Sequence, residues 1–271
     1  MSHEANPRLP SLERGALLVT LVALVLGVSL LVPSLSIPRW PWEIPPFNAR
    51  FIGMIYLAGW VGTCCSFVVG RRSPAIGFTR AAAAFTAVAT LASLLHRDAF
   101  LPDRPLAVAV WWLAYIGFFI SLTVITRRLA ALPVIGQPPS AGRRRRYGGY
   151  AALTAAYGLA MFLVPTQATA FWPWPVDAFH ARVYSGIFLS GSALLIGLRG
   201  VHRPADLALA GLLQAVFGLG AVWGTWSVNR TVPRVDWSAG GSLIWLLIFG
   251  GVGLTGLVML ILALRQRGHD A

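Results

Sequence analysis

The sequence WPWEIPPFNAR at Trp40–Arg50 returns as WPWPVDAFHAR at Trp172–Arg182, 132 residues further along the chain. The match extends on both sides of this stretch. Between Leu31 and Gly59 it runs without a gap and keeps 12 identical residues in 29 positions. Self-similarity at a fixed spacing is the mark of an internal duplication, so we expect the chain to consist of two copies of one unit.

The composition around these two stretches is that of a membrane protein. Of the 271 residues, 56% are hydrophobic and only 11% are charged, whereas a soluble domain carries about 25% charged residues. All 22 basic residues are arginine, a bias from which we expect a bacterial source. The arginines lie in short segments between apolar stretches, which is a topology signal and not the basic patch of a nucleic-acid-binding protein.

Eight apolar stretches are long enough to cross a bilayer. A span of roughly 20 residues covers the ~30 Å of hydrocarbon, and helix is the expected structure because no strand alternation is present. The predicted helices cover residues 16–32, 51–69, 74–95, 105–125, 147–164, 183–198, 204–226 and 241–264. The predicted fold class is therefore an all-α integral membrane protein with eight transmembrane helices.

The duplication divides these helices into two groups of four. We expect one four-helix repeat over 15–130 and a second over 147–265, joined by an Arg-rich linker at 131–146 and flanked by polar tails at 1–14 and 266–271. With an even number of helices, both repeats would insert the same way up. They would then be parallel and related by a pseudo-twofold axis along the membrane normal.

The distribution of arginine predicts the orientation. The two tails and the connections on their side hold 15 arginines, and the connections on the other side hold 7. The positive-inside rule then places both termini and the linker in the cytoplasm, in an inner (plasma) membrane, with the two Trp-Pro-Trp segments outside. The run Arg143, Arg144, Arg145 and Arg146 is expected to contact anionic lipid headgroups.

The repeated tryptophans Trp40, Trp42, Trp172 and Trp174 allow two interpretations. Tryptophan prefers the membrane–water boundary and proline fixes turns, so an aromatic belt on rigid turns is the favoured one. The alternative is that both segments fold over the outer mouth of the helix bundle and take part in binding a ligand there.

Arg50 and Arg182 each begin a helix, where the helix dipole disfavours a cation. An anionic partner should compensate each of them. A lipid phosphate is the favoured partner. The alternative is a ligand carboxylate or phosphate held between the two arginines, because guanidinium groups bind such anions bidentately.

The second copy carries Asp177 and His180 where the first copy has Pro45 and Asn48. Together with Arg182 they form an acid–histidine–arginine cluster that could serve a proton-coupled step, since histidine titrates near neutral pH. A loop cluster without chemistry is the favoured interpretation of these residues.

Nothing else in the sequence indicates catalysis. No acidic residue stands near the centre of an apolar stretch, which argues against an ion-coupled carrier. Phosphate-binding, nucleophile and zinc motifs are absent from the sequence, and no mid-span histidine is placed to ligate haem. We therefore expect no catalytic residue, metal or cofactor.

The sequence resembles no family of known function, and three functions remain open. The favoured one is a non-catalytic bundle that binds a lipid or other apolar ligand, or that serves as a subunit of a membrane complex. The alternative is a carrier for a small anion or amphiphile, gated at the outer face by Arg50 and Arg182. An enzyme that modifies lipids through Asp177 and His180 is the third. The expected partners are membrane lipids, an anionic amphiphile or a membrane-complex protein, and not nucleic acid.

Overall fold

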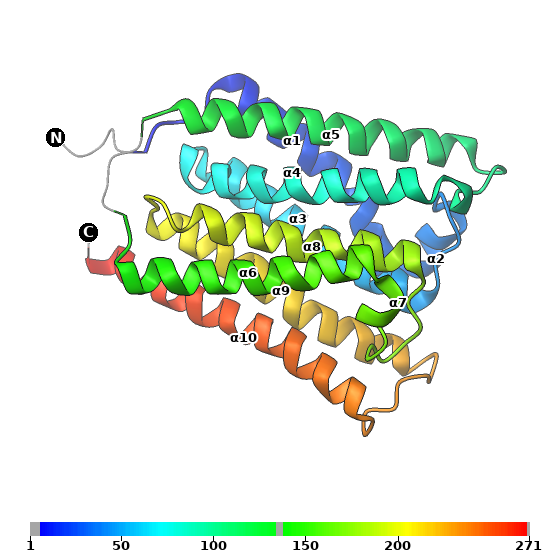
Figure 1. Cartoon of the computed structure of the whole chain (residues 1–271). Helices are drawn as coiled ribbons and strands as arrows, with labels where there is room; N and C mark the ends of the chain where they lie inside the picture. Colours follow the sequence, from blue (N-terminus) through cyan, green and yellow to red (C-terminus); the bar gives the residue numbers. More distant parts are fainter. Residues whose placement is uncertain (1–5, 134–137, 270–271) are drawn as a thin grey trace.

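The computed structural model describes residues 6–133 and 138–269, with side chains described up to residue 266. This part of the chain is helical throughout and contains no β-strand (Figure 1). Its long helices are α1 (Ser11–Val28), α3 (Pro46–Val69), α4 (Arg72–Leu95), α5 (Pro105–Ala131), α6 (Ala141–Leu163), α8 (Ala178–Gly197), α9 (Pro204–Asn229) and α10 (Gly240–His269). Between them lie the short helices α2 (Pro33–Ser36) and α7 (Pro165–Ala168) and the 3₁₀ turns η2 (Ser29–Leu31), η3 (Ile37–Arg39) and η4 (Arg97–Ala99).

The ends of the helices follow local sequence signals. Pro46, Pro105 and Pro204 each stand in the first turn of a helix, where a missing backbone N–H costs nothing and the fixed φ angle suits the helix. Asp177 caps α8 by accepting a hydrogen bond from the backbone N–H of His180. Gly70 ends α3 in the left-handed conformation with φ of 60°, which glycine adopts without steric cost.

Seven of the described helices are long and apolar enough to cross a membrane, and they indicate a multi-pass membrane protein. They are α1 continued by η2, and α3, α4, α5, α8, α9 and α10. Helix α6 does not belong to this set because Arg143–Arg146 occupy its first turns. The sequence predicted a loop here, but α5 continues to Ala131 and α6 already begins at Ala141. Arginine is a good helix former, so charge alone does not end a helix.

The interior contacts of the bundle join helices from opposite halves of the chain. In the interior α3 lies against α9, and α4 lies against α8. The remaining long helices cover this centre, with α1 on α3, α5 on α4, α6 on α8 and α10 on α9 (Figure 1). Contact between α9 and α10 is close because glycines face each other. A Cβ atom added to Gly218 would lie 2.4 Å from the backbone nitrogen of Gly253, so this approach requires the absence of side chains.

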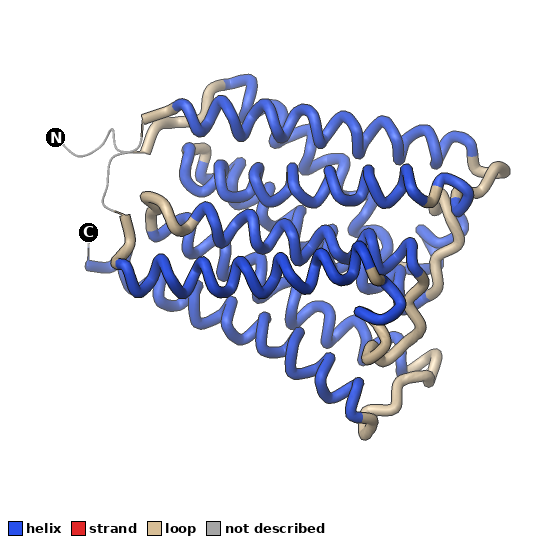
Figure 2. Tube along the Cα trace, viewed as in Figure 1, coloured by secondary structure: helices blue, strands red, loops and turns tan. Residues whose placement is uncertain are grey.

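The connections between helices lie at the two ends of the bundle (Figure 2). At one end, the backbone N–H of Leu9 donates to the carbonyl of Gly70 at 3.0 Å, which ties the segment before α1 to the end of α3. The other end holds both Trp-Pro-Trp segments, and we call it the tryptophan end. Helices α2, α3 and α4 begin at residues 33, 46 and 72, and α7, α8 and α9 begin at 165, 178 and 204, each 132 residues later.

Candidate functional site

The four repeated tryptophans are buried and do not form an aromatic belt. Trp40, Trp42, Trp172 and Trp174 are 8%, 1%, 6% and 4% exposed. The proline-containing segments turn inward, and the indoles pack with other rings in the interior of the tryptophan end. Trp42 lies 4.6 Å from Trp111 between ring centroids. The belt interpretation was wrong because the four rings lie in the interior, where aromatic side chains bury a large area against one another.

Hydrogen bonds hold each segment in place. The guanidinium Nη1 of Arg104 donates to the carbonyl oxygens of Ile37 and Trp40, at 3.1 and 2.7 Å. In the second segment the indole N–H of Trp172 donates to the hydroxyl of Tyr157 at 2.9 Å. Each segment is thus fixed by residues of its own half of the chain.

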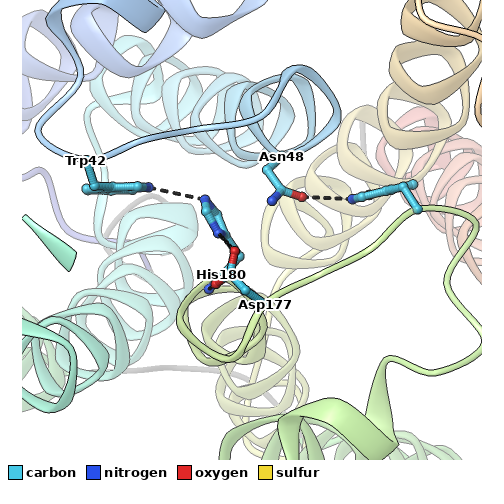
Figure 3. A network of polar contacts seen from close by, with 5 residues as sticks. Trp42, Asn48, Asp177 and His180 are labelled. Atoms are coloured by element: carbon cyan, nitrogen blue, oxygen red, sulfur yellow. Dashed lines mark hydrogen bonds and ion pairs between the residues drawn. The ribbon is translucent and has the colours of Figure 1, made fainter.

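The second tryptophan of each segment crosses to the other half of the chain. The indole Nε1 of Trp42 donates to Nε2 of His180 at 3.2 Å, and Nε1 of Trp174 donates to Oδ1 of Asn48 at 2.8 Å (Figure 3). The two donors are 132 residues apart, and so are the two acceptors. We call these two hydrogen bonds the exchanged indole contacts. They join the halves at the starts of α3 and α8.

His180 is the centre of a short polar chain, although it is only 2% exposed. Its Nδ1 contacts Oδ2 of Asp177, while its Nε2 accepts from Trp42 (Figure 3). Because an indole N–H can only donate, Nε2 carries no hydrogen and the proton of the neutral ring lies on Nδ1, facing the carboxylate. Burial raises the pKa of Asp177, but the hydrogen bonds that its carboxylate accepts from His180 outweigh burial and lower this pKa to about 2.

The structure brings Asp177 and His180 together as the sequence predicted, but Arg182 takes other partners. Its Nε donates to the carbonyl of Phe162 at 3.0 Å, and its Nη1 contacts Nε2 of His96 at the end of α4. Burial and then the charge of Arg182 lower the pKa of His96, against smaller opposing effects of Asp98 and Asp177. A neutral His96 can accept from the guanidinium group, so Nε and Nη1 of Arg182 both have partners within the protein.

Arg50, the counterpart of Arg182, has different surroundings. Its guanidinium carbon lies 5.6 Å from the ring centroid of Trp223 on α9, a cation–π contact. Its Nε is buried and has no hydrogen-bond partner among the described residues. The two arginines, which the sequence presents as equivalent, therefore differ in that one is satisfied internally and the other is not.

No known protein family, curated protein or solved structure shows a significant match to this chain. Its function is therefore argued from the geometry of its own residues.

A large cavity extends through the bundle beside these contacts. Its volume is about 1590 Å³, and all eight long helices contribute to its walls. Its lining is mainly apolar and includes Trp40, Trp111 and Tyr115 towards the tryptophan end. Leu106 and Leu153 also line it and are 77% and 68% exposed, so the cavity is continuous with the outer surface of the bundle.

Charged groups stand at both ends of this cavity. Arg39 and Arg104 line it at the tryptophan end, and Arg143 and Arg146 line it at the start of α6. The Arg143–Arg146 run, expected as a lipid-contacting surface, thus contributes two residues to the rim of the cavity. Neither of these two makes an ion pair with any carboxylate in the described part of the chain.

The polar chain around His180 has the geometry of a structural junction. The imidazole is enclosed, and both of its nitrogens are occupied by Trp42 and Asp177. Among the described residues no group of three or more His, Cys, Asp or Glu side chains could hold a metal ion.

The sequence signal for this junction is the alignment of His180 with Asn48, two side chains that can both accept a hydrogen bond. Trp111, which also belongs to the aromatic core, carries no comparable signal.

Proposed function

We propose that this protein is a non-catalytic membrane protein that binds a lipid or lipid-like amphiphile in the cavity between its helices. One observation carries the proposal, namely an apolar cavity of about 1590 Å³ with arginines at both ends. Ordinary small-molecule pockets have volumes of about 300–1,000 Å³. The larger volume suits acyl or isoprenoid chains, and the terminal arginines suit an anionic headgroup.

The surroundings of the cavity support a ligand from the bilayer. Exposed leucines such as Leu106 and Leu153 border it, so its opening faces the surface that a membrane-spanning bundle presents to lipid. A lipid could enter sideways without passing through water. Because its chains would pass from one apolar environment to another, packing against the cavity walls and contacts of the headgroup, and not removal from water, would favour binding.

The proposal includes a duplicated architecture with eight crossings, in which α6 is the eighth span. The common offset of 132 residues in the starts of three helix pairs supports it, as do the exchanged indole contacts. In this pairing α3 corresponds to α8 and α4 corresponds to α9. The contact of α3 with α9 in one half therefore corresponds to the contact of α8 with α4 in the other. In this arrangement the repeats would be parallel, and the excess of arginine supports cytoplasmic termini in an inner (plasma) membrane.

Filling the cavity tests the proposal. Gly59 and Gly191 line the cavity, and a Cβ atom on either would meet no atom closer than 3.7 Å. The double variant Gly59→Phe/Gly191→Phe should therefore reduce the space for a ligand. Native mass spectrometry of the purified chain, incubated with dioleoyl phosphatidylglycerol, should show fewer bound lipids than in the wild type.

A matched control distinguishes the cavity from the outer surface. Gly117 and Gly250 have open space at their Cβ positions and do not line the cavity. Gly117→Phe/Gly250→Phe adds the same two rings outside and should retain lipid. Equal lipid binding by the wild type and the cavity-filled variant, with both folded, would show that the cavity is not the binding site.

A carrier for an amphiphile is the second candidate. The cavity is bordered by arginines at both ends of the bundle, as a path across the membrane would require. Lipid scrambling between the leaflets of reconstituted vesicles would favour this carrier, whereas retention of lipid without scrambling would favour the binding protein. The gating role of Arg50 and Arg182 stays a prediction, and Arg50 is considered further below.

A further inference from the structure

Two exposed tryptophans and two arginines form a continuous stripe at the tryptophan end of α9. Trp223 and Trp226 are 51% and 49% exposed. Arg50 reaches from α3 onto the ring of Trp223 at 5.6 Å, and Arg230 lies over the ring of Trp226 at 5.2 Å. Residues 223, 226 and 230 share one face of a helix because their spacing is three and four. We call these four residues the α9 stripe.

The charges of the α9 stripe have no counterions in the part of the chain that the structure describes. Among the described residues no carboxylate lies within ion-pair distance of Arg50 or Arg230. The buried Nε of Arg50 has no hydrogen-bond partner. Each guanidinium group lies over an aromatic ring near an apolar surface. Neither has an anion to balance its charge, so both could still bind one.

The other half of the chain shows what a completed arrangement looks like. Arg182 is bound by Phe162 and His96. Leu91, Leu94 and Asp98 stand 132 residues before Trp223, Trp226 and Arg230. The corresponding residues are thus two leucines at the end of α4 and an acid in η4. The two sets of residues differ, and only the one on α9 combines aromatic rings with uncompensated positive charge.

We propose that the α9 stripe binds the phosphate headgroup of an anionic membrane lipid. The half-exposed indoles suit the boundary between headgroups and acyl chains, where tryptophan is enriched. A phosphate there can accept hydrogen bonds from a guanidinium group bidentately. None of the four residues lines the cavity, so this site is separate from the ligand site proposed above and goes beyond it.

Competition between two lipids tests the site. The purified full-length chain would be incubated with equimolar dioleoyl phosphatidylglycerol and dioleoyl phosphatidylcholine, and native mass spectrometry would give the ratio of the two bound lipids. Arg50→Gln and Arg230→Gln should each reduce the preference for phosphatidylglycerol by about fivefold, the effect of one basic residue near a membrane surface. The double variant should lower the preference further than either single variant, and any preference that remains should come from the arginines at the ends of the cavity.

Controls separate a local site from general charge. Arg97→Gln removes an exposed arginine at the same end of the bundle and should leave the preference unchanged. An equal loss in Arg97→Gln, or an unchanged preference in the double variant, would overturn the proposal. Arg230 is exposed, so Arg230→Gln should fold and can carry the test even if Arg50→Gln does not.

Two further arms address the source of the phosphate and the cavity. Excess inorganic phosphate should not displace phosphatidylglycerol, because the stripe recognises a lipid. Displacement by free phosphate at low concentration would overturn the assignment to lipid. Gly59→Phe/Gly191→Phe should lower total lipid binding but keep the headgroup preference of the remaining bound lipid. Loss of that preference in the cavity-filled variant would place the selective site in the cavity and refute the stripe.

Discussion

Replacing His180 tests whether the exchanged indole contacts hold the two halves of this protein together. His180→Leu introduces an apolar side chain of similar size and removes the acceptor for the indole N–H of Trp42, whose Nε1 lies 3.2 Å from Nε2 of His180. His180→Asn introduces the side chain that accepts from Trp174 at the corresponding place in the other half, at 2.8 Å. The two substitutions should therefore differ sharply.

The magnitude follows from burial. Trp42 is 1% exposed and His180 is 2% exposed, so water cannot replace the lost acceptor. A buried donor without a partner costs about 1–3 kcal/mol. We expect His180→Leu to lower the free energy of unfolding by that amount. His180→Asn should lower it by about 1 kcal/mol or less, since the hydrogen bond is retained and only a small void is left.

A double-mutant cycle isolates the contact from the packing. Trp42→Phe removes the donor together with part of the ring, and the cycle cancels losses of packing that occur in both backgrounds. Replacing both partners by apolar groups leaves no orphaned donor, so the coupling between Trp42→Phe and His180→Leu should be about 1–2 kcal/mol. Unfolding of the purified chain in mixed micelles, followed by near-ultraviolet circular dichroism, measures each free energy.

The other half of the chain offers a matched control. Asn48→Leu removes the acceptor of Trp174, but it also removes the buried Nδ2 of Asn48, which has no partner among the described residues, so it should destabilise the protein by somewhat less than His180→Leu. Additive effects of Trp42→Phe and His180→Leu would contradict the reasoning. The same conclusion would follow if His180→Asn were as damaging as His180→Leu, because a hydrogen-bond acceptor would then not be what this place requires.

Three further predictions address topology and pH. The first uses a background in which the native cysteines are replaced. There Glu43→Cys, at an exposed position near Trp42, should react with an impermeant thiol reagent on intact cells, and Ser140→Cys should not. The opposite labelling would reverse the proposed orientation. The lowered pKa of His96 means that the unfolded chain takes up this proton first, so stability should fall as pH drops below about 6.5, and thermal unfolding of His96→Gln should show a weaker dependence there. Asp177 has a pKa of about 2 in place of 3.8, so its contribution is present above pH 3.8 and should disappear towards pH 2. Unfolding of Asp177→Asn should lack this acid-sensitive component, and an unchanged acid profile would remove Asp177 as its cause.

The helical segments could be predicted from the sequence because apolar composition and proline act locally. The helices expected to begin at 105 and 204 do begin at Pro105 and Pro204. The exposed or buried state of the tryptophans could not be predicted in this way. Trp40 and Trp42 suit either an interface or a core, and only the rings that reach them from distant segments decide between the two. Trp111, for example, lies 4.6 Å from Trp42 between ring centroids.

The pairing of residues in the candidate site shows the same division. Asp177 and His180 are three residues apart at a helix start, so their contact is a local property. The partner of Arg182 is His96, 86 residues away, and no pattern in the sequence connects them. The matching sequence around Arg50 and Arg182 makes this harder, since it suggests equal roles for the two arginines although their neighbours differ.

The sequence by itself determined that this chain is helical and suited to a membrane, because hydropathy and helix length depend on residues that are neighbours in the chain. It also contained the 132-residue offset that relates Trp42 to Trp174 and Asn48 to His180. Only the tertiary structure decided that each tryptophan donates to the acceptor in the opposite half and that a large cavity lies between the helices. Both depend on which helix faces cross, and this follows from packing between segments far apart in the sequence.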